Sequence, residues 1–224
     1  MLRCAKCSKI LLGTFYKDWA GQRVCPNCLA SLGRCASCFR FCIPGRAYKS
    51  IPVPVCGECA RNRISVEVVP KIVALIKEIY AQGGIKIKSP ITLKLVEMQK
   101  IREVSSTEGS LGVAQRVGNA YTIFVFNALS RVAFADVIAH ELLHIYQYEN
   151  GYAPPADLCE GLCNLGSYVV LAELDRRNIE RAEARSRIDA LMSNPDPNYG
   201  VGFRRLLSLY QASGWPAPLQ KLKG

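Results

Sequence analysis

The chain has 224 residues, half of them hydrophobic, which is enough for a folded core and excludes an intrinsically disordered chain. No uninterrupted apolar run reaches the roughly 18 residues of a membrane span, and the first residues lack an apolar signal core, so we expect a cytoplasmic protein with no membrane partner. The formal net charge is +11, and residues 1–63 carry 11 Lys and Arg against 2 acids, which favours acidic partners for this part of the chain.

Eight of the eleven cysteines form an internal repeat near the N-terminus. Each unit has two CxxC pairs separated by 17 residues, and the second unit follows the first at an offset of 31 residues. A CxxC turn directs two thiolates at one metal, and a second pair completes a tetrahedron. The repeat therefore predicts one structural zinc on each set: Cys4, Cys7, Cys25 and Cys28, and then Cys35, Cys38, Cys56 and Cys59.

Zinc is expected to provide much of the folding free energy of residues 1–63, because units this small bury little apolar surface. Paired fingers of this layout are similar to LIM domains. Here the spacer between Cys28 and Cys35 has six residues, whereas a typical LIM spacer has two, so we describe the domain as LIM-like. Cys42 lies outside the repeat and is expected to be a small buried residue, with ligand exchange with Cys38 as the alternative.

The remaining residues, 64–224, predict an α+β domain. The predicted elements, in chain order, are a helix over 65–80 ended by Gly83 and Gly84, strands over 85–88 and 91–96, a polar loop over 105–112, and a strand over 121–126. Helices follow over 130–148, from residue 155 onward, over the Arg- and Glu-rich stretch 171–192, and over 198–212. The alternating charges of 171–192 are typical of surface ion pairs rather than of a nucleic-acid site.

The sequence His140-Glu141-Leu-Leu-His144 contains both histidines of the chain. Histidines four residues apart lie on one face of a helix, about 40° apart around its axis, and can bind one Zn²⁺. Glu160 lies sixteen residues further on, in a predicted helix, and is the expected third ligand. Glu141 is then placed to act as the general base that takes a proton from the attacking water.

Other residue positions narrow the class of zinc site. The metzincin pattern requires Gly and His where this chain has Gln147 and Asn150, so that class is excluded. Asn164, one helical turn after Glu160, is predicted to orient a ligand imidazole, with a surface or capping role as the alternative. Cys159 and Cys163 are interpreted as small core residues, because a four-residue helical spacing is poor for a disulfide.

A hydrogen-bond donor for the oxyanion of the transition state is also expected. No histidine remains for this role, so a tyrosine is the natural candidate. Tyr199 is the first choice, and packing alone is the competing interpretation. The alternative donors are Tyr146, Tyr148 and Tyr152.

Four runs in this region, 123–131, 138–144, 151–152 and 160–163, together resemble the peptidase domain of the ubiquitin-activated LIM peptidases that limit organ size in plants. Residues 199–204 resemble the C-terminal motif of that family. The resemblance implies a minimal gluzincin that binds zinc through His140, His144 and Glu160 and uses Glu141 as the base. It also implies that strand 121–126 forms the upper rim of the cleft and pairs with extended substrate.

Two features differ from the plant proteins. Cys159 stands where the family usually has an acid, and we expect no ubiquitin-interacting motifs before the fingers. We therefore expect a compact relative and do not transfer activation by ubiquitin.

The leading hypothesis is a zinc endopeptidase with three zinc ions per chain, acting on protein or peptide substrates. In this hypothesis the LIM-like fingers provide targeting or regulation through a protein partner. The alternative is a non-catalytic zinc-finger adaptor that binds a protein partner. A nucleic-acid-binding role is disfavoured, because the basic fingers lack the repeated Lys/Arg and aromatic pattern that would contact bases.

Overall fold

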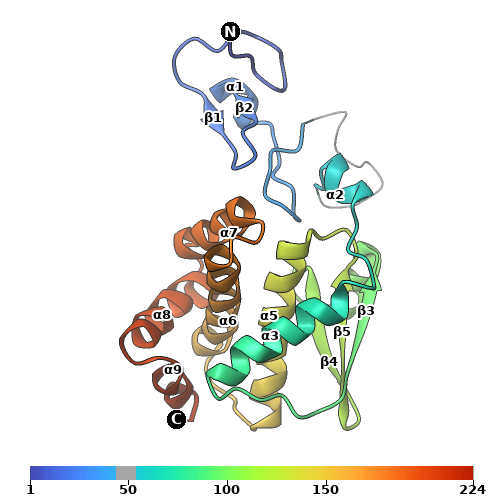
Figure 1. Cartoon of the computed structure of the whole chain (residues 1–224), viewed down its shortest axis with the longest axis vertical. Coiled ribbons are helices and arrows are strands. Elements are labelled where there is room, and N and C mark those ends of the chain that lie inside the picture. The colour runs from blue at the N-terminus through green and yellow to red at the C-terminus, as the bar shows by residue number, and fades with distance from the viewer. Residues whose placement is uncertain (44–53, 224) are drawn as a thin grey trace.

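The computed structural model describes residues 1–43 and 54–223, in which the chain is a mixture of helix and sheet. We call the two cysteine units, within 1–63, the finger module; Figure 1 shows it stacked on the end of a larger helical and sheet part. The finger module contains β1 (Tyr16–Lys17), β2 (Arg23–Val24), α1 (Pro26–Leu29) and α2 (Gly57–Arg61). Within the described ranges, no helix is both long and apolar enough to cross a membrane.

The larger part begins after the linker between α2 and α3. Its elements are α3 (Val69–Gln82), β3 (Ile91–Val96), α4 (Met98–Val104), β4 (Gly112–Val117), β5 (Ala120–Phe126), α5 (Arg131–Glu149), α6 (Ala156–Arg176), α7 (Arg181–Ser193), the π-helical turn η1 (Pro197–Val201), α8 (Gly202–Ser213), α9 (Pro216–Gln220) and the 3-10 turn η2 (Lys221–Lys223).

The two cysteine units repeat each other in hydrogen bonding as well as in sequence. The Cys25 N–H donates to Cys4 Sγ at 3.4 Å in the first unit, and the Cys56 N–H donates to Cys35 Sγ at 3.3 Å in the second. These donor and acceptor positions differ by 31 residues, the offset of the repeat. The two units therefore share one local fold.

Among the described residues the larger part has one sheet, with the strand order β3-β5-β4. β3 is parallel to β5, with Ile91 opposite Tyr121, and β4 is antiparallel to β5, with Ala114 opposite Ile123. β5 is thus the central strand, and its buried Ile123 and Val125 face the helices. β4, which the sequence did not predict, forms an edge.

The prediction of a strand over 85–88 is wrong, because these residues form no strand in the structure. The Ile85 N–H donates to the Tyr80 carbonyl at 3.0 Å and so closes the end of α3. The Lys88 and Ser89 N–H groups donate to the Glu149 carboxylate at the end of α5, with Ser89 at 2.6 Å. This backbone therefore bonds to helix ends instead of joining a ladder.

Two predicted helices have different limits in the structure. The helix predicted over 65–80 begins at Val69, because Pro70 favours a first-turn position. The stretch 171–192 is divided between α6 and α7, and Asn178 and Glu180 adopt positive φ angles of 59° and 42° at the break.

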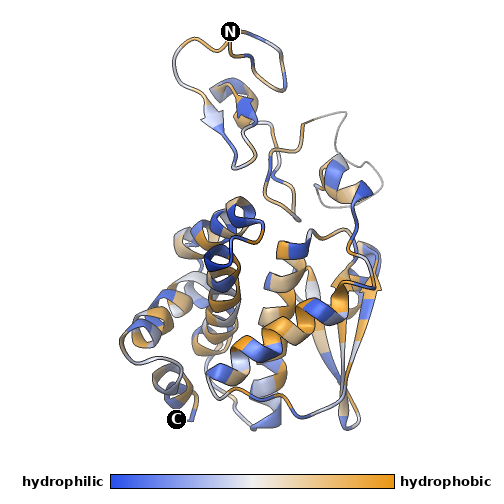
Figure 2. Cartoon of the chain, in the orientation of Figure 1, coloured by the Kyte–Doolittle hydropathy of each residue, from blue (hydrophilic) through white to orange (hydrophobic). Residues whose placement is uncertain are grey.

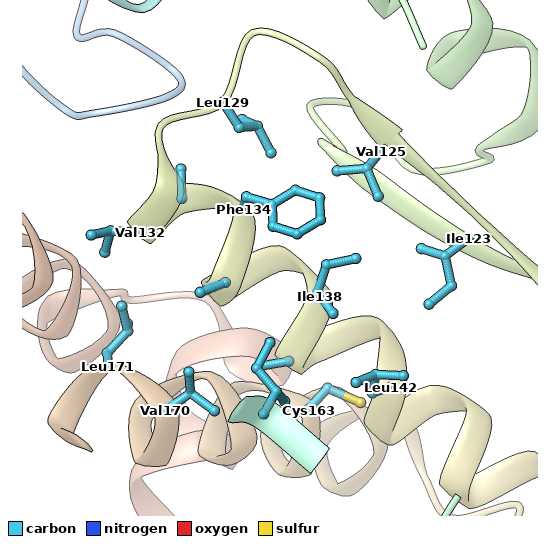
Figure 3. Close-up of a cluster of buried hydrophobic side chains, with 14 of the residues drawn as sticks. Ile123, Val125, Leu129, Val132, Phe134, Ile138, Leu142, Cys163, Val170 and Leu171 are labelled. Atoms are coloured by element: carbon cyan, nitrogen blue, oxygen red, sulfur yellow. The ribbon is translucent and has the colours of Figure 1, made fainter. Parts of the chain in front are cut away.

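Helix α5 lies at the centre of the larger part. Its N-cap Ser130 accepts a hydrogen bond from the Ala133 N–H at 3.1 Å. Its side chains pack on β5 and α6, as the cluster of Phe134, Ile138 and Leu142 shows (Figure 3). Figure 2 shows the hydrophobic colour running along α5 and the strands, whereas hydrophilic residues gather on α7.

Helices α3 and α6 also pack against α5. The buried Tyr80 hydroxyl of α3 donates to the Ala139 carbonyl at 2.7 Å, next to His140. Helix α6 packs against α5 and also touches the start of α8. At that point a β-carbon on Gly161 would lie 2.6 Å from the Gly202 carbonyl carbon, so two backbones meet without side chains between them.

We predict that Gly161→Ala destabilises the protein by about 2 kcal/mol, because the added methyl overpacks the contact between α6 and α8. Helix propensity alone predicts the opposite sign, a gain of about 1 kcal/mol for Ala over Gly. Urea unfolding of the two proteins measures the difference. Equal or greater stability of the variant would contradict the close packing described here.

Candidate metal centres and active-site cleft

The eight repeat cysteines form two separate groups of four. In each group the sulfur atoms lie within 4.8 Å of one another, so each group could hold a metal ion. The groups are the predicted ones: Cys4, Cys7, Cys25 and Cys28, and Cys35, Cys38, Cys56 and Cys59. Four convergent thiols are the usual donor set of a closed structural zinc site. Cys42 is buried and lies outside the second group, as expected.

A third group of candidate ligands lies between α5 and α6. His144 Nε2 is 3.1 Å from His140 Nε2, and Glu160 Oε2 is 3.2 Å from His140 Nε2 and 3.5 Å from His144 Nε2. Ligand atoms at tetrahedral positions around zinc are separated by about 3.3 Å, given bond lengths of about 2.0–2.1 Å. The three donor atoms are therefore spaced as a single zinc ion would require.

Asn164, on α6, fixes the orientation of His140. Its Oδ1 is 3.0 Å from His140 Nδ1, and its Nδ2 donates to the Tyr199 carbonyl at 2.6 Å. Because the amide nitrogen is engaged by a carbonyl, Oδ1 is the acceptor that faces the imidazole. With a metal ion bound, His140 would carry its proton on Nδ1 and present the Nε2 lone pair to the ion. Asn164 is only 6% exposed, which disfavours the alternative surface role.

The Glu160 carboxyl group is in the ionised state that a metal ligand requires. Burial raises the pKa of this carboxyl, but hydrogen bonds and charge from His140 and His144 outweigh burial and hold the pKa well below its usual range. The carboxylate is therefore ionised at neutral pH.

Two thiols lie close to the same histidines. Cys163 groups with His140 and His144, and Cys159 groups with His144 and Glu160. Burial raises the pKa of the Cys163 thiol to about 11, and the thiol accepts a hydrogen bond from Gln147 at 3.2 Å. Cys159 Sγ lies 3.9 Å from His144 Nδ1, whereas Glu160 Oε2 lies 3.5 Å from His144 Nε2, the nitrogen nearest His140. Glu160 is thus the better third donor.

A cleft of about 700 Å³ opens in front of these residues, and Glu141 lines it with both histidines and Glu160. Glu141 Oε2 accepts a hydrogen bond from the Ala114 N–H of β4 at 2.8 Å. The bond fixes the carboxylate at the cleft wall. Gly112 permits this approach, since a β-carbon there would lie 2.4 Å from a methyl of Val137.

The strand that borders the cleft differs from the predicted one. Strand 121–126 corresponds to β5, which is paired on both sides, by β3 and β4. Its backbone therefore has no edge to offer to a substrate, and the prediction that it forms the rim is wrong. β4 is the edge strand on the side of the cleft, and its residues 112–115 line the cleft.

Two of the four candidate tyrosines line the cleft. Tyr199 stacks on His140 with ring centroids 6.3 Å apart, and Tyr148 stacks on His144 at 6.2 Å. Tyr146 and Tyr152 contact each other instead and are not among the lining residues. Burial and the nearby Glu160 carboxylate raise the pKa of Tyr199 to about 12, so its hydroxyl keeps its proton at neutral pH.

The position of Tyr199 depends on the glycines that follow it. A β-carbon on Gly200 would lie 1.9 Å from the Asn194 carbonyl oxygen, and one on Gly202 would lie 2.1 Å from the Asp157 carbonyl oxygen. Asp196 accepts hydrogen bonds from the N–H groups that begin η1, including that of Tyr199 at 2.9 Å. Through these contacts η1 and the start of α8 pack closely on their neighbours, including α6, and the Tyr199 ring lies beside His140.

The cleft-lining residues that the sequence did not suggest as functional include Phe39 of the second cysteine unit, Ala114 of β4, Asp136 of α5 and Arg187 of α7. No sequence signal marks them. Phe39, Asp136 and Arg187 come together through the packing of the finger module and α7 on the start of α5, and Ala114 reaches the cleft through the edge of β4.

Neither a protein-family model, nor a curated protein, nor a solved structure matches this chain. The functional proposal therefore depends on the residues and their geometry.

We predict that the purified protein holds three zinc ions, and that mild chelation removes the one bound by His140, His144 and Glu160 first, because an open site is more accessible than a closed thiolate site. Elemental analysis before and after dialysis against a chelator measures the number of zinc ions per chain and the number that mild chelation removes. Glu160→Ala should hold two zinc ions, whereas the matched control Cys159→Ala should keep three. A count near one in the wild type would overturn the assignment of two four-cysteine sites, and loss of zinc in the control alone would make the thiol the ligand.

Proposed function

We propose that the chain is a zinc-dependent endopeptidase that hydrolyses peptide bonds of protein substrates. The observation that carries the proposal is the convergence of His140, His144 and Glu160 donor atoms within 3.5 Å, with Glu141 in the same cleft. Two imidazoles, one carboxylate and an open position form the donor set of hydrolytic zinc sites. A site built only for stability would be closed by a fourth side chain.

A zinc ion held by these three side chains would supply a Lewis acid that polarises the carbonyl of the scissile bond. Glu141 accepts a proton from the attacking water and passes it to the leaving amine. The hydrogen bond from Ala114 restrains one carboxylate oxygen, so that the other is presented to the cleft. The base is thereby oriented before substrate binds.

Tyr199 donates a hydrogen bond to the carbonyl oxygen of the substrate as negative charge develops on it. The raised pKa, about 12, keeps the donor proton in place across the physiological range. Tyr148, stacked on the other histidine, is the alternative donor.

The resemblance of residues 123–204 to the peptidase domain of the plant LIM peptidases agrees with this proposal. It suggests that the larger part is a minimal gluzincin and that the finger module, which could hold two zinc ions, is a LIM-like domain. In that reading the module, with its excess of basic residues, targets or regulates the peptidase by binding a protein partner.

The competing function is a non-catalytic adaptor, in which the fingers bind a partner and the larger part serves as a scaffold. A scaffold would not require a carboxylate oriented by a strand edge beside the histidine pair. Cleavage of casein or of a peptide pool by the zinc-loaded protein separates the two functions, because an adaptor leaves both intact.

We predict that Glu141→Gln keeps three zinc ions and lowers kcat at least 10²-fold. The side chain keeps its size and loses its basicity, and a general base contributes roughly 10² to 10⁴ to a rate. The measurement is cleavage of a fluorogenic peptide pool, with metal content determined on the same sample. Undiminished cleavage by the variant would remove Glu141 from the mechanism.

We predict that Tyr199→Phe lowers kcat on the order of 10²-fold with little change in KM, because only the donor hydroxyl is lost. Tyr148→Phe is the matched control, since its ring stacks on His144 in the same way, and it should change kcat less. Steady-state kinetics of both variants give the comparison. The reverse ranking would transfer the donor role to Tyr148.

A further inference from the structure

The cleft does not end at the metal ligands; it continues along α5 to the finger module. Asp136 lies one helical turn before His140, and Ser167 and Arg187 lie beside it. The ring of Phe39 completes this end of the cleft. Phe39 follows Cys38 directly, so a residue of the second cysteine unit stands in the wall of the proposed substrate site.

The repeat provides an internal comparison for this contact. At the offset of 31 residues, Ser37 corresponds to Lys6 and Phe39 corresponds to Ser8. Lys6 is half-buried and Ser8 is exposed in the first unit, whereas Ser37 is fully buried and Phe39 is half-buried in the second. The second unit therefore departs from the first at two positions that meet the larger part.

The hydrogen bonds of Ser37 fix the second unit on the start of the active-site helix. Its hydroxyl oxygen accepts from the Ser130 N–H at 2.7 Å, at the N-cap of α5. Its carbonyl accepts from the Arg187 guanidinium. The residue two positions before Phe39 is thus held by both α5 and α7.

The backbone at Phe39 is unusual for so large a residue. Ser8 and Phe39 both have φ angles of 61°, because each follows the second cysteine of a turn. This left-handed conformation is strained for a residue with a β-carbon, and Gly or Asn normally occupies it. A phenyl ring in such a position indicates a role that offsets the strain.

The surroundings of Phe39 indicate which side chains it would accept. The Arg187 guanidinium lies 4.4 Å from the centre of its ring and is itself only 2% exposed. Asp136 pairs with Arg187 at 2.8 Å, and Glu183 lies 3.6 Å from it. Because the buried cation already has a carboxylate partner, the Phe39 ring at this end of the cleft lies beside a paired charge.

We propose that Phe39 is a specificity-determining residue, which forms a subsite for a bulky apolar side chain of an extended peptide. The proposal depends on the proposed function in taking a peptide as the ligand. It gives the second finger a direct part in substrate selection, in addition to any part in binding other proteins.

The test uses zinc-loaded Glu141→Gln protein, which binds peptides without turning them over. Peptide sets in which each position in turn is Phe, Leu, Ser or Glu are titrated against proteins with Phe or Ser at position 39. At one peptide position, the protein with Phe39 should bind peptides with Phe or Leu about tenfold more tightly than peptides with Ser. The Phe39→Ser protein should lose this preference. The preferences at the other peptide positions should not change. The matched control is Ser8→Phe, which makes the reciprocal exchange in the first unit and should change nothing.

A structural role for Phe39 would give a different result. It would lower the affinity for all peptides together, with a fall in zinc content or in Tm. Phe39→Leu provides a second variant, which should retain the apolar preference with a lower ratio of Phe to Leu. A preference that survives in Phe39→Ser, a uniform loss at all positions, or no apolar preference in the parent protein would each overturn the proposal. Failure of the wild type to cleave the peptides that it selects would overturn the peptidase function alone.

Discussion

The packing of α6 against α5 is the contact on which the candidate site depends. It brings a carboxylate of α6 within 3.5 Å of two imidazoles of α5, and it places Asn164 where it orients one of them. These three groups are largely removed from water, and a zinc ion shared between them would add metal–ligand bonds to the contact. We therefore expect the metal to stabilise the pairing of the two helices as well as to activate the substrate.

The same helix pair links the site to both ends of the chain. On one side, Gly161 and Gly202 allow α8 to touch α6, which sets the position of Tyr199. On the other, Ser130 at the start of α5 receives the second cysteine unit through Ser37. The cleft therefore has walls from the finger module, from β4 and from the C-terminal helices, and its shape depends on all three being in place.

The histidine pair and the CxxC pairs, as candidate metal ligands, could be found from sequence because the spacing within each pair is local. A four-residue separation of histidines and a repeated CxxC fix the geometry whatever surrounds them. β4 escaped prediction because Gly112, Gln115 and Arg116 give it a mixed, half-polar pattern suited to an edge. The rim assigned to strand 121–126 failed because a strand pattern does not reveal how many neighbours the strand has. The contact of Ser37 with Arg187 spans 150 residues and has no local signal.

The central claim is that His140, His144 and Glu160 share one zinc ion. Anomalous diffraction at the zinc absorption edge, from crystals of the full chain, tests it most directly. The account predicts three anomalous peaks, two within the four-cysteine groups and one between the Nε2 atoms of the histidines and the Glu160 carboxylate. A protein fully loaded at the cysteine groups that shows no peak between α5 and α6, or a peak bound by Cys163 in place of Glu160, would contradict the account.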